Sequence, residues 1–217
     1  MMKTPNGIFI TIEGVEGVGK STNIEAVNEY LLEKEVEFII TREPGGTILA
    51  EKMRDLLLQI NADEELSELS ELLLIFAARA QHLEQLIRPA LTEGKWVICD
   101  RFTDATYAYQ GAGRALDRNK IAQLETLVQG DLRPDITIIL DLDPEAGLQR
   151  AQGRGALDRI EREKLEFFIR VRSAYIEIAI AEPDRCLVID ASQDIDTVKT
   201  NLLIALDQKL ETLLGDD

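Results

Sequence analysis

The stretch GVEGVGKS, residues 14–21, constrains the fold of this chain more than any other. It matches the pattern G-x-x-x-x-G-K-[ST], and it lies between the β-branched run FITIE and a stretch with helical periodicity, which is the context that a phosphate-binding loop requires. Gly14, Gly17 and Gly19 let the backbone turn tightly so that its N–H groups converge on an anion, and the following helix adds the positive end of its dipole. The loop therefore predicts a binding site for the phosphates of ATP or GTP.

Within this loop, we expect Lys20 to reach the β- and γ-phosphates and the Ser21 hydroxyl to bind Mg²⁺. Asp100 ends the later run KWVICD, where proteins with this loop place a carboxylate in the outer coordination sphere of the metal. The expected cofactors are thus ATP and Mg²⁺. The predicted contacts with ATP cover the whole loop: Gly14, Val15, Glu16, Gly17, Val18, Gly19, Lys20, Ser21 and Thr22.

Five runs rich in β-branched residues alternate with stretches of helical periodicity: GIFITIEG, VEFIIT, KWVICD, DITIILDLD and RCLVID. This alternation predicts an α/β fold with a parallel sheet flanked by helices. Because 217 residues suffice for one core and no linker interrupts them, we expect a single domain over residues 1–217. The clearest helix is predicted at about residues 66–91, where Leu72, Phe76, Leu83 and Leu86 recur at helical spacings.

Acidic residues outnumber basic ones by 40 to 24, and the formal net charge of −16 argues against binding to a nucleic-acid polymer or an anionic membrane. No apolar run is long enough to cross a bilayer and the N-terminus has no signal-peptide core, so we expect a cytoplasmic protein. Cys99 and Cys186 lack metal-ligand spacing and are interpreted as reduced packing residues on strands.

A GTPase is the first alternative because GTPases share the phosphate-binding loop. The guanine-reading pattern N-K-x-D is absent, since Asn119-Lys120 continues with Ile121, Ala122 and Gln123. A motor or transporter ATPase usually needs a longer chain or partner modules. The sequence therefore favours a nucleotide-handling enzyme of the size of a small kinase.

Transfer of a phosphoryl group to an acceptor phosphate requires cations on both sides of the transferred group. Arg42 in TREPGGT and Arg101 in CDRF follow predicted strands, at the edge where parallel sheets bind ligands. Arg79 lies on the buried stripe of the long helix, so either an internal carboxylate or a ligand must satisfy its charge. His82, on the same helix, is interpreted as structural.

Together these stretches resemble the bacterial thymidylate kinases, which convert dTMP and ATP to dTDP and ADP. The resemblance is carried by GVEGVGKS, TREPGGT, the helix with Arg79, DRFTDATYAYQGAGR, RPDITIILDLDPEAGLQR and GALDRIE, and it covers roughly residues 8–190. It implies the three-layer P-loop nucleoside-monophosphate kinase fold and a homodimer. Another nucleoside-monophosphate kinase and a regulatory ATP-binding protein without turnover stay open as alternatives.

The resemblance implies roles for four residues around dTMP. Glu16 would face the sugar 3′-hydroxyl and the metal region, and it joins Lys20 and Arg101 among the predicted catalytic residues. Arg42 and Arg101 would hold and neutralise the acceptor phosphate, while Arg79 would hydrogen-bond thymine, which would answer its buried charge.

The segment DRFTDATYAYQ and the long helix complete the dTMP site that the resemblance implies. Thr106 would read the base edge, Tyr109 would crowd the sugar 2′ position, and Gln110 would lie near the base. The family usually has an aromatic residue four positions before the base-reading arginine, where this chain has Ile75. We expect either that Phe76 stacks on thymine or that an aliphatic contact replaces the stacking.

The segment RAQGRGALDR resembles the lid that the bacterial enzymes close over ATP, here at about residues 150–160. Some relatives carry a catalytic arginine inside the glycine loop, where this chain has Gly17, so Arg154 between two glycines is the predicted catalytic arginine. Arg150 would lie near the donor phosphates or adenine, and Arg159 could serve either nucleotide. Asp158 and Glu161 would orient these arginines or a metal-bound water, and a solvated charged loop is the alternative.

Overall fold

The computed structural model describes residues 7–60, 63–153 and 158–215 of the chain. Five parallel strands form one sheet in the order β2-β3-β1-β4-β5. The α/β fold with a five-stranded parallel sheet is thereby confirmed. Four strands lie inside runs that the sequence indicated, and β2 extends one residue beyond its run, to Arg42. The strands are β1 (Phe9–Glu13), β2 (Phe38–Arg42), β3 (Trp96–Asp100), β4 (Ile136–Asp141) and β5 (Cys186–Asp190).

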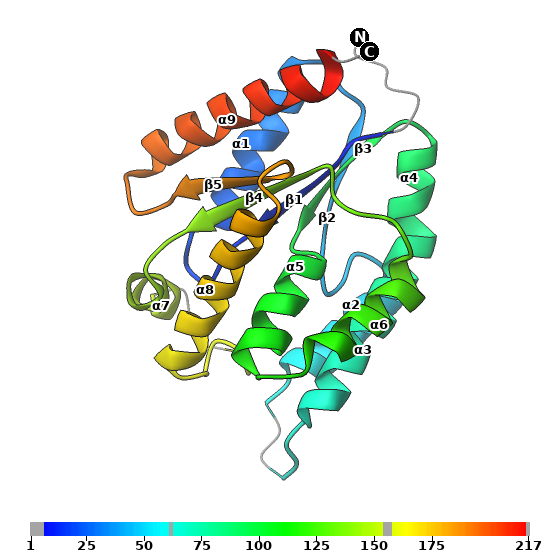
Figure 1. Ribbon diagram of the computed structural model, residues 1–217, viewed down its shortest axis with the longest axis vertical. Coiled ribbons are helices and arrows are strands. Elements are labelled where there is room, and N and C mark those ends of the chain that lie inside the picture. The colour runs from blue at the N-terminus through cyan, green and yellow to red at the C-terminus, as the bar shows by residue number, and fades with distance from the viewer. Residues whose placement is uncertain (1–6, 61–62, 154–157, 216–217) are drawn as a thin grey trace.

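Helices cover both faces of the sheet, which gives three layers (Figure 1). Helices α1 (Lys20–Glu33) and α9 (Ile195–Gly215) pack together on one face, and α4 (Arg88–Thr92), α5 (Thr103–Thr106) and α8 (Leu165–Ala181) lie on the other. Beyond the carboxyl edge of the strands lie the helices that follow β2, β3 and β4. These are α2 (Ile48–Leu58), α3 (Glu68–His82), α6 (Arg118–Gln129) and α7 (Pro144–Gln152).

The core forms on both faces of the central strands because these strands are apolar on both sides. Ile10 and Ile12 of β1 are fully buried, as are Val27 of α1 and Val171 of α8 on opposite faces. Cys99 and Cys186 are buried and free of disulfides, in agreement with their interpretation as packing residues. In the part of the chain that the structure describes, no helix is long and apolar enough to cross a membrane.

The register of the strands places several polar residues at one edge of the sheet. Ile12 of β1 and Arg42 of β2 both lie beside Asp100 at the end of β3. Glu13, the last residue of β1, leads directly into the glycine loop. The carboxyl ends of three adjacent strands therefore meet where an open parallel sheet binds ligands.

The long helix differs from its prediction in one respect. It continues from α3 through a π-helical segment, η1 (Leu83–Ile87), into α4, so that its periodicity is interrupted. A π turn inserts one extra residue and rotates everything after it. Leu86, which the helical spacing placed on the buried stripe, is therefore only half-buried, and Ile87 is fully buried instead.

Candidate active site

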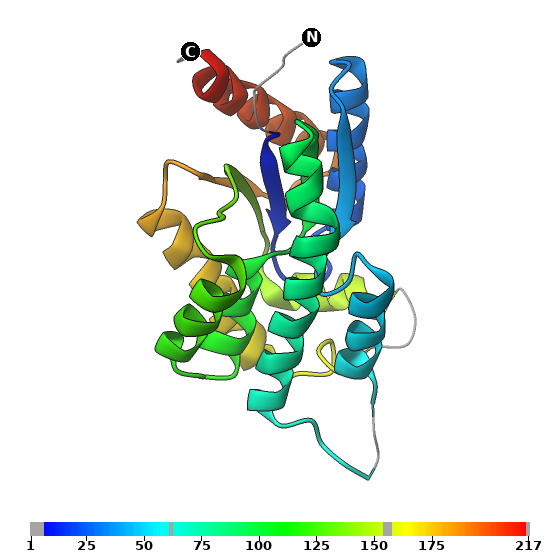
Figure 2. The same cartoon turned by 90° about the vertical axis from the view of Figure 1, so that its right-hand side faces the viewer.

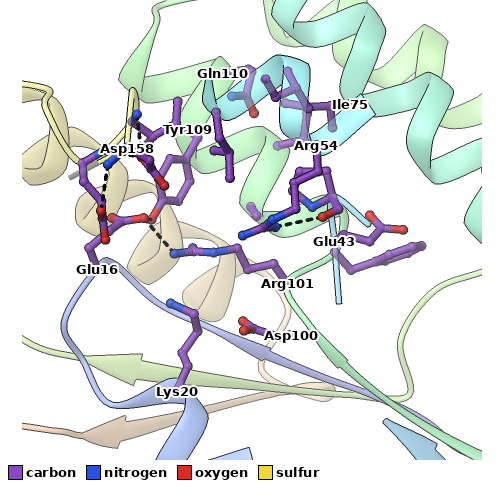
Figure 3. A pocket seen from close by; sticks show the side chains of 18 of the residues that line it. Glu16, Lys20, Glu43, Arg54, Ile75, Asp100, Arg101, Tyr109, Gln110 and Asp158 are labelled. Atoms are coloured by element: carbon purple, nitrogen blue, oxygen red, sulfur yellow. Dashed lines mark hydrogen bonds and ion pairs between the residues drawn. The ribbon is translucent and has the colours of Figure 1, made fainter. Parts of the chain in front are cut away.

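A cavity of about 240 Å³ opens at the carboxyl edge of the sheet (Figure 3). Arg101 lies between one end of the cavity, with Lys20 and Asp100, and the other, with Ile75 and Gln110. The two ends of the cavity thus differ in their side chains, and the guanidinium of Arg101 lies between them. Its wall combines the glycine loop, the ends of β2 and β3, helices α2 and α3, the start of the helix after β3, and residues 158–161.

The glycine loop has the backbone conformation that its sequence demands. Gly14, Gly17 and Gly19 have φ values of 136°, 75° and 90°, a region that other residues rarely adopt. A Cβ atom on Gly17 would lie 1.9 Å from the carbonyl oxygen of Gly147 in α7. The loop side chains Val15 and Val18 are 3% exposed and pack in the core, so their contribution to the site comes from the backbone.

Lys20 begins α1, and its Nζ lies 3.4 Å from the carbonyl oxygens of Gly14 and Val15, folded back over the loop. Burial, followed by the nearby Arg101, lowers the pKa of Lys20 to about 8 against the opposing pull of Asp100. Among the described residues, no carboxylate lies at ion-pair distance from this ammonium group, and a bound phosphate would supply the missing anion. Thr22, the third residue of α1, does not line the cavity.

Two residues at the same end could hold a magnesium ion. The Oδ1 atom of Asp100 is buried and has no hydrogen-bond partner among the described residues, and Ser21 lines the same cavity. No group of three or more His, Cys, Asp or Glu side chains in the described ranges is arranged to hold a metal. The Ser21 hydroxyl and the Asp100 carboxylate are two oxygen donors, which suits Mg²⁺ because this ion keeps several waters and takes further ligands from phosphates.

Arg101 has a left-handed backbone, with φ of 68°, which is uncommon for a residue other than glycine. The turn is held by Glu13, whose Oε1 accepts a hydrogen bond of 2.7 Å from the backbone N–H of Phe102. The other oxygen, Oε2, accepts from the Tyr175 hydroxyl at 2.7 Å. Burial and the charge of Asp104 raise the pKa of Glu13 to about 7.

The side chain of Arg101 is fixed by three further contacts. Its guanidinium donates to the Gly14 carbonyl at 2.7 Å and to Glu16 Oε1 at 2.9 Å, and it lies over the ring of Tyr109. The Tyr109 hydroxyl donates to Glu16 Oε2 at 2.8 Å, and burial raises the pKa of Tyr109, so the phenol remains protonated. The structure therefore brings three of the predicted site residues together.

Arg79 is 2% exposed and sits between the rings of Phe76 and Phe102. Its Nε donates to Glu43 Oε2 at 2.7 Å, and its Nη2 donates to Thr106 Oγ1 at 3.0 Å. The remaining nitrogen, Nη1, is buried without a partner among the described residues. The buried charge is thus balanced by an internal carboxylate, and one donor is left over in a residue that lines the cavity.

His82 and Glu43 form the support behind Arg79. The imidazole bridges Thr41 Oγ1 at 2.7 Å and Glu43 Oε1 at 3.1 Å and is fully buried, in agreement with the structural role predicted for it. Glu43 lies in TREPGGT, so the cluster joins the loop after β2 to α3. Sequence reasoning did not assign Glu43 a role, although a buried arginine one turn before a histidine calls for a nearby carboxylate.

The cavity wall near Arg79 contains Ile75 and Gln110 but not Phe76. Successive residues of a helix are rotated by about 100° from one another. Phe76 therefore faces the core with Leu72 and Ile121, where it is 2% exposed, and Ile75 faces the cavity. The sequence left open whether Phe76 or an aliphatic side chain contacts the base, and this geometry favours Ile75 over the predicted Phe76.

Arg42 also departs from its expected place. Its guanidinium is half exposed and paired with Glu51 at 2.7 Å, outside the cavity wall. Arg54 of α2 lines the cavity instead and donates to the Pro44 carbonyl at 2.8 Å, with no carboxylate of the described residues at ion-pair distance. Burial and the neighbouring Arg42 lower the pKa of Arg54, as expected where positive charge is in excess. An arginine inside an ordinary amphipathic helix gave no sequence signal.

The lid is described only in part. Arg154 and its neighbours up to residue 157 lie outside the described residues. Arg150, on α7, donates to the Ala191 carbonyl at 3.3 Å and does not line the cavity. Arg159 does line it, together with Asp158 and Glu161, and reaches across to Glu71 of α3 at 2.6 Å and to the Leu57 carbonyl of α2 at 2.8 Å.

Comparisons with known proteins identify the relatives of this chain. Residues 12–202 match the family model described as thymidylate kinase. Thymidylate kinases from Ectopseudomonas mendocina and Pseudomonas syringae pv. syringae are 55% and 56% identical to it over 209 residues, which is 96% of this chain and 99% of theirs. A crystal structure of thymidylate kinase from Ehrlichia chaffeensis superposes with a TM-score of 0.75 at 39% identity, covering 93% of this chain and all of that one.

Proposed function

The chain belongs to the thymidylate kinase family, and we propose that the cavity at the carboxyl edge of its sheet is where it transfers the γ-phosphoryl group of ATP to dTMP. The products are dTDP and ADP. The observation that carries this proposal is the pairing of two ends in one cavity. A phosphate-binding loop with Lys20, whose pKa is lowered to about 8, lies at one end, and the Nη1 donor of Arg79, without a partner among the described residues, lies at the other.

The donor end holds the triphosphate. The N–H groups of the glycine loop and the ammonium of Lys20 bind the phosphates, and Thr22 follows in the first turn of α1. Ser21 and the free Oδ1 of Asp100 would hold Mg²⁺, the hydroxyl directly and the carboxylate through a water. When bound, the ion neutralises charge that develops on the phosphates.

The acceptor end holds dTMP with its phosphate toward the centre of the cavity. Arg101 and Arg54 bind and neutralise the acceptor phosphate, so that it can approach the γ-phosphoryl group in line. Arg42 stays paired with Glu51, outside this contact. The acceptor is already an ionised phosphate at neutral pH, so the reaction requires no general base.

The sugar and the base of dTMP contact a further group of side chains. Glu16 and Tyr109 lie against the sugar, where the carboxylate meets the 3′-hydroxyl and the phenol ring crowds the 2′ position. Arg79 Nη1 donates to the base while Thr106 holds the same guanidinium from behind. Gln110 and Ile75 complete the contact with the base.

We assign the catalytic lid to residues 150–160 of this single domain. Arg154 would reach the γ-phosphoryl group when the lid closes. It would do so in place of the loop arginine of some relatives, where this chain has Gly17. Arg150 remains a candidate for adenine or the donor phosphates after a change from its present contact with Ala191. A nucleotide enzyme of this kind fits a cytoplasmic location, where ATP is supplied.

The proposed function is tested by ADP production from Mg·ATP with dTMP, dUMP, UMP, dCMP, CMP, AMP and GMP as acceptors. We expect strong stimulation by dTMP, weaker stimulation by dUMP and little by the ribonucleotides. ADP release that is equal with and without every acceptor would show that the cavity does not hold an acceptor nucleotide.

We also propose a homodimer. Helices α2, α3 and α6 pack side by side, and they lie toward the viewer in Figure 2. All three carry exposed apolar side chains. Those with at least 49% exposure are Ile48, Leu49, Leu56, Leu69, Leu73 and Leu127. Light scattering after size exclusion should give twice the 24.3 kDa chain mass, and Leu73→Glu should give the monomer mass. A wild-type mass of one chain at micromolar concentration would refute this arrangement.

A further inference from the structure

Glu71 of α3 is a buried carboxylate whose contacts join the base end of the cavity to the lid. It is 1% exposed, lies in the cavity wall, and accepts four hydrogen bonds. Oε1 accepts from Gln110 Nε2 at 2.6 Å and from Arg114 Nε at 3.4 Å. Oε2 accepts from Arg159 at 2.6 Å and from Arg114 Nη2 at 3.3 Å.

The carboxylate is ionised at neutral pH. Burial raises the pKa of Glu71, but the hydrogen bond from Gln110 and the charges of Arg114 and Arg159 outweigh the burial and hold the pKa below its ordinary value. An ionised carboxylate only accepts hydrogen bonds. Gln110 must therefore turn its NH₂ group toward Glu71, and its carbonyl oxygen Oε1 points away from Glu71.

The orientation of this amide matters because Gln110 lines the same cavity as Arg79. Oε1 of Gln110 has no partner among the described residues, while Nη1 of Arg79 is a donor without one. The base end thus offers one donor and one acceptor. Thymine presents an acceptor at O4 and a donor at N3–H, whereas cytosine presents a donor at N4 and an acceptor at N3.

We propose that Glu71 is a specificity-determining positioning residue, which fixes the Gln110 amide so that the base end accepts from N3–H of thymine and rejects cytosine. The inference rests on the proposed function and deepens it. If Gln110 turned over, its NH₂ group would meet N3 of cytosine, but its carbonyl oxygen would then face the Glu71 carboxylate. Two acceptors in contact lose a hydrogen bond to a charged group, which corresponds to about 10- to 100-fold in an equilibrium.

The test replaces this acceptor by a group that can also donate. In Glu71→Gln the residue keeps its shape, and both orientations of Gln110 find a partner. We expect the ratio of kcat/KM for dTMP to kcat/KM for dCMP to fall by about 10- to 100-fold. Glu163→Gln is the matched control, because Glu163 pairs with the same Arg114 but does not touch Gln110, and its ratio should equal that of the wild type.

The ratio distinguishes base selection from a general structural effect. If Glu71 only anchors Arg114 and Arg159, Glu71→Gln lowers kcat/KM for both nucleotides by one factor, and an unchanged ratio overturns the proposal. The same variant in a Gln110→Met background should leave the ratio where Gln110→Met alone puts it, since the amide through which Glu71 acts is gone.

Two further measurements test the role of Glu71. Should Glu71→Gln fail to fold, Gln110→Met still decides, because full discrimination against dCMP in that variant would remove Gln110, and Glu71 with it, from base selection. A wild-type protein that produces ADP with dTMP but shows no preference over dCMP overturns this inference alone. A wild-type protein whose ADP production is not stimulated by dTMP overturns the proposed function itself.

Discussion

The turn that carries Arg101 is supported by a carboxylate that is buried at a thermodynamic cost. Glu13 is fully buried, and its pKa is raised from 4.5 to about 7, first by burial and then by the nearby negative charge of Asp104. Tyr175 and Arg101 lower the pKa of Glu13 but do not cancel this effect. The charge of Glu13 in turn raises the pKa of Lys20. We therefore expect the stability of the protein to depend on pH through Glu13.

The direction in which stability changes with pH follows from proton binding. Between pH 4.5 and 7 the folded protein keeps the Glu13 proton that the unfolded chain has lost, so the folded state binds more protons. The stability that Glu13 provides is therefore greatest below pH 4.5, falls as the pH rises to 7, and is constant above it. Between pH 5 and pH 8 this change amounts to about 2.5 kcal/mol of unfolding free energy.

Urea unfolding at pH 5 and pH 8, without nucleotide, measures this quantity in wild type and in Glu13→Gln. The wild type should lose about 2.5 kcal/mol more than the variant between the two values of pH, because all other titrating groups are shared. Glu33→Gln, at an exposed position on α1, should behave like the wild type. Parallel curves for wild type and Glu13→Gln would refute the reasoning, whatever their absolute stabilities.

Three further predictions concern the reaction. Arg54→Ala should raise the KM for dTMP by about 30-fold, as expected for the loss of a hydrogen bond to a charged group, while Arg42→Ala should change it less than about threefold. The reverse order would show that Arg42, and not Arg54, binds the acceptor phosphate. At pH 8.5, ATP binding should take up about 0.75 proton as Lys20 regains its charge. Titration calorimetry in buffers of different ionisation enthalpy measures this uptake, and Lys20→Met should abolish it. Arg154→Ala should lower kcat by several orders with a smaller effect on dTMP binding, and a kcat within about tenfold of wild type would exclude a catalytic role.

The parts of the account that sequence could predict are those with strong local signals. The five strands followed from runs of β-branched residues, and the glycine loop followed from positions where only a positive φ permits the turn. The buried stripe of α3 was predicted correctly through Leu72, Phe76 and Arg79 because an unbroken α-helix keeps its period. The π segment after His82 then shifted the register, which no spacing rule anticipates.

The parts that sequence missed are acidic residues that meet their partners only in the folded chain. Glu43 and Arg79 are separated by 36 positions, and Glu71 and Arg159 by 88, yet both pairs decide how a cation faces the cavity. Such carboxylates look like ordinary surface residues in a chain with 40 acidic side chains. Arg54 was missed for the related reason that its burial depends on the loop after β2 and not on its own helix.

The central claim is that one cavity holds the phosphate of dTMP at Arg101 and Arg54 and the base at Arg79. A crystal structure with dTMP and a non-hydrolysable ATP analogue tests it most directly. We expect the 5′-phosphate within hydrogen-bond distance of both arginines, the O4 atom at Arg79 Nη1, and the triphosphate on the glycine loop. A base placed away from Arg79, or a phosphate held by Arg42 outside the cavity, would contradict the account.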